Sequence, residues 1–77
     1  MTEAIARVTR VVVAAAFADG YRIWTGTYPN ATKKQTLAYG AASAPAKSWL
    51  SRGYRVTLTA TDFVASTDVQ TQVVVPA

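Results

Sequence analysis

The carboxylates are the residues best suited to chemistry in this chain, and there are only four: Glu3, Asp19, Asp62 and Asp68. Acid–base catalysis needs two titratable groups in one pocket, and only Asp62 and Asp68 flank a single short predicted turn. The same pair could offer oxygens to Ca²⁺, but calcium takes about six to eight ligands. We therefore expect both carboxylates to brace the turn through hydrogen bonds to its backbone.

Other catalytic side chains are scarce. The chain has no cysteine and no histidine, which excludes thiol chemistry, disulfides and the commonest general base and metal ligand. Ser43 or Ser48 beside Lys47 imitates a Ser–Lys dyad, but a loop cap and a solvated lysine account for these residues more simply. We expect no enzyme activity, no metal and no cofactor.

The basic residues outnumber the acids by eight to four and give a net charge of +4. Aromatic residues lie near several of them in sequence, and stacking platforms beside cations suit single-stranded nucleic acid. The alternative is that the aromatics belong to the core and the bases are scattered over the surface. We keep four of these bases as candidate partner contacts: Lys33, Lys34, Arg52 and Arg55.

The segment from Glu3 to Ala18 fits two structures. As a helix it would align Glu3, Arg7 and Arg10 on one face. As a strand it uses the Val-rich stretch 8–13, and Asp19-Gly20 supplies a hairpin turn. Three consecutive valines are poor helix material because each loses χ1 freedom, so we predict a strand.

The middle of the chain predicts shorter elements. A strand is expected over 21–28, ended by Pro29-Asn30, and a more polar strand over 33–39. The small residues of 40–46 suggest a loop. Ser43 could cap one short helical turn that runs through Trp49 and breaks at Gly53.

The C-terminal part shows the clearest pattern. Apolar residues alternate with polar ones from Tyr54 to Phe63, which indicates a half-buried antiparallel strand. A turn over 65–68 leads to a last strand over 69–75. Period-2 alternation places one set of side chains inside, and we expect the core to include Trp24, Trp49, Tyr54, Val56 and Leu58.

This hairpin resembles the last two strands of bacterial Ig-like domains of the PKD type. The shared features are the Gly53-Tyr54 start, the alternating strand that ends in Thr61-Asp62, and the Val-rich final strand. Tyr21-Arg-Ile-Trp24 is similar to an upstream strand of that family, although Thr25-Gly26-Thr27 replaces the Asp-x-Gly-Asp-Gly pattern that follows there. The resemblance implies an Ig-like fold, and fold alone does not imply function.

We therefore expect one domain over 1–77: an all-β, small antiparallel Ig-like β-sandwich of about five to seven strands, with one short helical turn. Small Ig-like proteins of this kind look like phage virion components, such as capsid decoration or tail-associated proteins. The expected role is structural or adhesive, and the expected partner is a larger protein assembly or further copies of the chain. The charge-free end of the last strand adds three candidate contacts: Val73, Val74 and Val75.

Two other functions stay open: a small basic nucleic-acid-binding β-protein, and a small phage-encoded inhibitor of a host protein. Residues 7–18 imitate a signal peptide, with two arginines, a short apolar run and an Ala16-Phe17-Ala18 triplet. That run is short for a signal sequence and too short to cross a bilayer. We expect no cleaved signal peptide, no membrane contact, and a location in the virion or the host cytoplasm.

Overall fold

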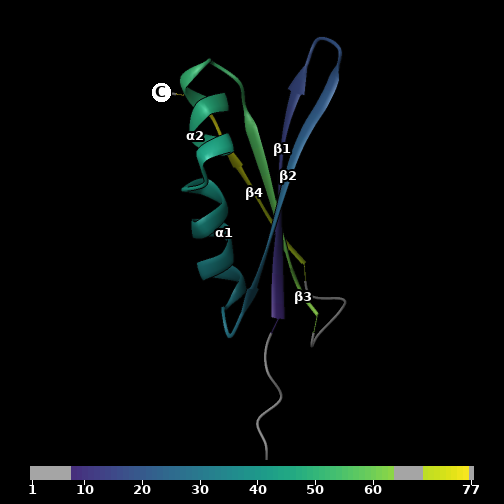
Figure 1. Cartoon of the computed structure of the whole chain (residues 1–77), viewed down its shortest axis with the longest axis vertical. Coiled ribbons are helices and arrows are strands. Elements are labelled where there is room, and N and C mark those ends of the chain that lie inside the picture. The colour runs from purple at the N-terminus through teal and green to yellow at the C-terminus, as the bar shows by residue number, and fades with distance from the viewer. Residues whose placement is uncertain (1–7, 64–68, 77) are drawn as a thin grey trace, which may run out of the picture.

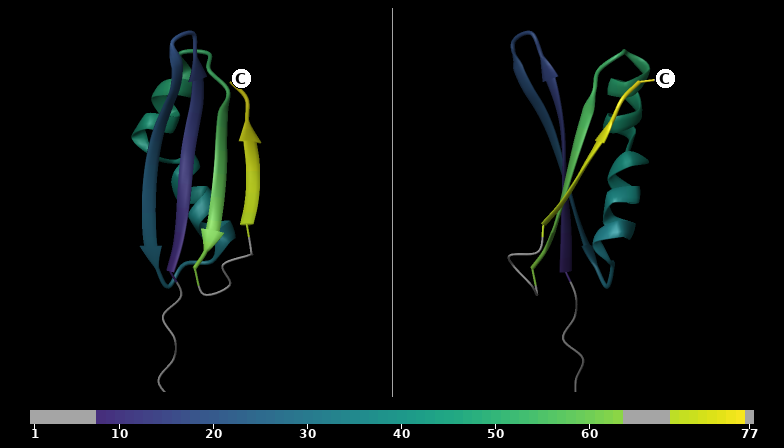
Figure 2. Two further views of the ribbon diagram at one scale, coloured as in Figure 1. Left: turned by 90° about the vertical axis from the view of Figure 1, so that its right-hand side faces the viewer. Right: turned by 180° about the vertical axis from the view of Figure 1, so that it is seen from behind.

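The computed structural model describes residues 8–63 and 69–76 (Figure 1). Its four strands form one antiparallel sheet in the order β2-β1-β3-β4. The two helices lie together on one face of this sheet (Figure 2). The elements in chain order are β1 Val8–Phe17, β2 Gly20–Pro29, α1 Lys33–Ala41, α2 Ala44–Ser51, β3 Val56–Asp62 and β4 Val69–Val74.

The hairpin β1–β2 confirms the strand prediction for residues 8–17, whereas residues 3–7 lie outside the described part. Phe17 pairs with Gly20 across the turn. Gly20 has a φ of +128°, a conformation that glycine adopts without the steric cost of a Cβ atom. The β-branched run Val11–Val13 lies within β1, between two neighbouring strands.

The strand predicted over 33–39 is wrong, because this segment forms α1. Thr32 caps the helix: its Oγ1 accepts a hydrogen bond from the Gln35 backbone N–H at 3.1 Å. The Gln35 side chain accepts from the Thr32 N–H at 2.9 Å, which completes a capping box. The loop predicted over 40–46 is also wrong except at positions 42 and 43, because 40–41 end α1 and 44–46 begin α2.

The predicted helical turn after Ser43 is confirmed, and it extends to the full helix α2. Ser43 Oγ accepts from the Ala46 N–H at 3.4 Å, and Pro45 occupies the first turn, where no N–H is needed. The chain leaves the helix through Gly53, at a φ of +90°.

The strands β3 and β4 lie within the ranges predicted for them. The inward residues of β3, Val56, Leu58 and Ala60, are fully buried, as the alternation predicts. β4 pairs only with β3 among the described residues and forms an edge of the sheet. The turn predicted over 65–68 lies outside the described residues.

The antiparallel sheet is confirmed, but the all-β prediction is wrong for the helical layer. In the described residues, the layer that faces the sheet consists of α1 and α2, at the place where a sandwich would have strands. The buried core lies between the two layers and comprises Val11, Val13, Leu37, Ala46, Val56, Leu58 and Ala60. Trp24 and Trp49 are half-buried and pack against this core, and Tyr54 stacks on Phe17 at a centroid distance of 4.1 Å.

Candidate docking surface

The face of the sheet opposite the helices is uncovered across all four strands in the described structure (Figure 2). Residues paired across an antiparallel sheet point to the same side. One row across this face is therefore Ile23, Ala14, Thr57 and Val73, and the next is Thr25, Val12, Thr59 and Thr71. We call this surface the open face; further members are Arg10, Ala16, Tyr21, Thr27, Thr61 and Val69, with Arg55 and Val75 at the strand ends.

Large apolar side chains stand exposed on the open face. Tyr21 is 74% exposed and Ile23 64%, both on β2. On and just beyond β4, Val69 is 52%, Val73 54% and Val75 64% exposed. These exposed apolar residues lie on the two edge strands of the same face, with Ala14 and Thr57 between Ile23 and Val73. Exposed apolar surface on one face marks an interaction site.

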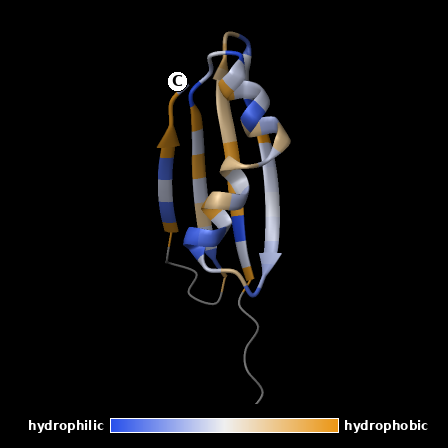
Figure 3. Ribbon diagram, turned by 90° about the vertical axis from the view of Figure 1, so that its left-hand side faces the viewer, coloured by the Kyte–Doolittle hydropathy of each residue, from blue (hydrophilic) through white to orange (hydrophobic). Residues whose placement is uncertain are grey.

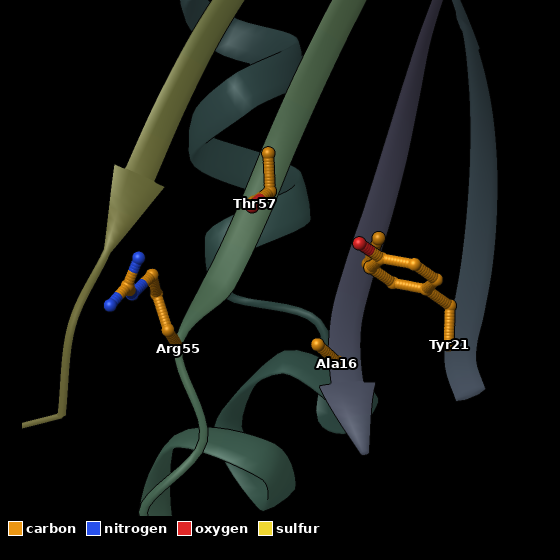
Figure 4. A pocket seen from close by; sticks show the side chains of 5 residues that line it. Ala16, Tyr21, Arg55 and Thr57 are labelled. Atoms are coloured by element: carbon orange, nitrogen blue, oxygen red, sulfur yellow. The ribbon is translucent and has the colours of Figure 1, made fainter. Parts of the chain in front are cut away.

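The charge of the open face is positive. Arg10 lies over the Phe63 ring with its guanidinium carbon 4.8 Å from the ring centroid. Arg55 lines a shallow depression with Ala14, Ala16, Tyr21 and Thr57, and the Tyr21 ring extends from β2 toward β1 (Figure 4). Of the acids in the described residues, Asp19 lies in the hairpin turn and Asp62 belongs to the helix-facing set of β3.

The structure distributes the predicted contact residues over three places. Arg55, Val73 and Val75 come together on the open face, whereas Val74 is half-buried on the helix side and packs against the core. Arg52 follows α2 at one end of the helical layer. Lys33 and Lys34 begin α1 at the other end (Figure 1).

Sequence reasoning misses Tyr21, Ile23 and Arg10 as contact residues. It predicts the strand over 21–28, but the two faces of that strand carry similar amounts of apolar surface. Only the pairing of Ile23 with Ala14 and of Tyr21 with Ala16 places these side chains opposite the helices.

A second cluster joins the hairpin tip to the end of α2. The Phe17 ring stacks on Tyr54 and lies edge-on to Trp49 at 6.4 Å. The guanidinium carbons of Arg22 and Arg52 lie 5.2 Å and 5.4 Å from the Phe17 centroid. Asp19 accepts a hydrogen bond from Arg22 at 3.1 Å. These ring and cation–π contacts link the hairpin to the end of α2, so they stabilise the hairpin against the helical layer.

Two of the candidate catalytic residues that the structure describes are buried or serve as a helix cap. Asp62 is 4% exposed, and its predicted companion Asp68 lies outside the described residues. Ser43 serves as a helix cap, and its hydroxyl donates to the Gly40 carbonyl at 2.6 Å. Within 8–63 and 69–76, the acids do not gather into a group of three or more that could hold a metal ion. Both described helices are too short to cross a membrane.

Comparison of the chain with family models, with curated proteins and with solved structures finds no match. The resemblance to PKD-type domains stays a prediction, and the function has to be argued from the geometry of the chain itself.

Proposed function

We propose that this chain is a non-enzymatic docking module whose open face binds a protein surface that is partly apolar and acidic. The observation that carries the proposal is the composition of that face: exposed Ile23, Val69 and Val73 together with Arg10 and Arg55. Burying the apolar side chains against a partner would favour association. Acidic groups on the partner would pair with the two arginines and set its orientation. A structural component of a larger particle, such as a phage capsid or tail, fits this role.

The distribution of the bases favours protein over nucleic acid as the partner. A nucleic-acid site gathers its cations on one side of the molecule. Of the described bases, only Arg10 and Arg55 belong to the open face, and the others lie near the hairpin tip, on the helices or just after α2. On the open face, the aromatic rings that could stack on bases are also separated. Tyr21 begins β2 and Phe63 follows β3, so these rings lie at opposite ends of the sheet.

Photo-crosslinking in the cells that produce the chain tests the proposal. A benzophenone amino acid replaces Ile23 or Val73 on the open face, and a matched control carries it at exposed Ser48 of α2. The proposal predicts one defined protein adduct from the two open-face positions and none from Ser48. Adducts of equal yield from all three positions, or none from the open face, would refute it.

The identity of the adduct separates the rival functions. A particle protein crosslinked at a fixed copy number supports the structural role, whereas a host enzyme would identify an inhibitor. A parallel titration with a fluorescent single-stranded oligonucleotide should show no binding at physiological salt. Binding that weakens steeply with salt, and that is lost in Arg10→Gln and Arg55→Gln, would instead identify the nucleic-acid function.

A further inference from the structure

The outer edge of β4 carries none of the features that usually protect an edge strand. Natural edges are blunted by charges, by proline within the strand or by bulges. β4 consists of Val-Gln-Thr-Gln-Val-Val without a charge or proline, and its pairing with β3 is continuous. The opposite edge, β2, has Arg22 within the strand and ends on Pro29. In the described structure the helices lie on the sheet face and leave the outer side of β4 clear (Figures 2 and 3).

The register shows which backbone groups of β4 point outward. The Phe63 N–H donates to the Val8 carbonyl at 2.9 Å, so this pair is hydrogen-bonded between β1 and β3. Bonding direction alternates along a strand. Ala60, Leu58 and Val56 of β3 therefore direct their backbone groups to Gln70, Gln72 and Val74 of β4. The remaining residues of β4, Val69, Thr71 and Val73, present their N–H and C=O groups to the outside.

The sequence of β4 is symmetric about the middle one of these outward residues. Val69-Gln70-Thr71-Gln72-Val73 is the same in both directions, and Figure 3 shows this as a symmetric pattern of hydropathy along the strand. If two such strands paired antiparallel around a two-fold axis at Thr71, each residue of 69–73 would lie opposite a residue of the same type. Thr71 would lie opposite the partner's Thr71, and Val69 opposite the partner's Val73.

We propose that β4 is a self-pairing edge: two copies of this chain join through antiparallel β4 strands, centred on Thr71. The outward groups of Val69, Thr71 and Val73 then exchange backbone hydrogen bonds with the same groups of the second copy. Like pairs of β-branched residues opposite each other stabilise antiparallel strands. The two four-stranded sheets become one sheet, and their open faces form one continuous docking surface. The interface is isologous, so it closes at two copies.

Electrostatics are compatible with this pairing and make it salt-dependent. The contact strand is uncharged, while each chain has a net charge of +4. Repulsion between the two chains acts over a distance and is screened by salt. The dimer should therefore become tighter as the salt concentration rises, the opposite of a contact held by ion pairs. Since the contact is a single strand pair, we expect a dissociation constant of about micromolar or weaker.

Disulfide trapping tests the register. The chain has no cysteine, so a Thr71→Cys variant has one possible partner, the same position on another copy. Residues in such a pair have Cα atoms about 5.5 Å apart, which a disulfide spans. Thr25→Cys is the matched control, because Thr25 shares the face and the row of Thr71 but lies on the opposite edge. Mild oxidation should link Thr71→Cys at least about tenfold faster than Thr25→Cys; equal rates would refute the pairing.

Hydrogen exchange and sedimentation on unmodified protein give an independent test. On dilution, the amides of Val69, Thr71 and Val73 should lose protection, whereas those of Gln70 and Gln72 keep it. Thr71→Lys sets two like charges against each other and should raise the dimer dissociation constant by about tenfold or more. Thr25→Lys should change it less than about twofold. A wild-type chain that stays monomeric at about millimolar concentration, or a dimer unaffected by Thr71→Lys, would overturn the proposal. Neither result would affect docking through the open face, which the crosslinks at Ile23 test separately.

Discussion

The two faces of the sheet are built from alternate residues of the same strands, yet they differ in how deeply their side chains are buried. On the helix side of β1 and β3, Val11, Val13 and Leu58 are fully buried. One residue further along, Val12 and Thr57 are half-buried on the open face, and Ile23 beside them is 64% exposed. The comparison indicates a division of labour: the helix face holds the fold together, and the open face is available for a partner.

Truncation of Leu58 should cause the largest loss of stability. Leu58 is fully buried in the core, and its truncation removes apolar contacts and leaves a cavity. We expect Leu58→Ala to lower the free energy of unfolding by about 2–5 kcal/mol. The neighbouring Thr57→Ala, on the open face, should lower it by about 1 kcal/mol or less. Urea unfolding of both variants measures the contrast, and equal losses would mean that the two faces do not differ as described.

Gly40 tests how closely the helical layer approaches the sheet. A Cβ atom at this position would lie 2.8 Å from Val11 Cγ2 and 3.2 Å from Val13 Cγ2, both in the packed core. Gly40→Ala should therefore cost about 1–3 kcal/mol by overpacking, although alanine is the better helix former. Truncating Val11 to alanine removes the nearest atoms. The cost of Gly40→Ala should shrink in that background, and full additivity of the two losses would contradict the close approach.

A buried hydroxyl pair ties α1 to β1. The Thr9 and Thr36 hydroxyls are hydrogen-bonded to each other, and either one can be the donor. Thr36 Oγ1 can also donate to the Thr32 carbonyl at 2.8 Å, and Thr9 Oγ1 to the Tyr28 carbonyl at 3.5 Å. Thr36→Val removes one partner of this pair and leaves the buried Thr9 hydroxyl with only the long contact to the Tyr28 carbonyl, which should cost about 1–3 kcal/mol. The double variant with Thr9→Val should lose less than the sum of the single losses, because neither hydroxyl is then left unsatisfied. Thermal unfolding of the four proteins measures this coupling.

The sequence predicted those parts of the fold that depend on local patterns. Alternation placed β3 and its buried residues Val56 and Leu58, and the Val-rich run identified β1. The Ser43 cap located the start of α2. Each of these signals lies within about ten residues of chain, so it can be seen without the fold.

With one exception, the predictions that failed depend on contacts between residues far apart in the sequence. Residues 33–39 show no clear helical spacing of apolar side chains, so the local sequence carries only a weak preference for any one structure. Burial of Leu37 against the sheet overrides that preference in favour of the helix. The exception is the capping box of Thr32 and Gln35, a local signal that does predict a helix start. The open face could not be predicted, since it exists only because both helices pack on the same side of the sheet.

The most direct test of the docking account changes the open face and measures stability and assembly in the same variant. Ile23→Thr combined with Val73→Thr keeps β-branched side chains in both strands while it removes exposed apolar surface. Because neither side chain is buried, the free energy of unfolding should fall by no more than about 1 kcal/mol. The number of copies recovered with the partner assembly should fall at least about tenfold. A variant that keeps its stability and still assembles at the wild-type copy number would contradict the account.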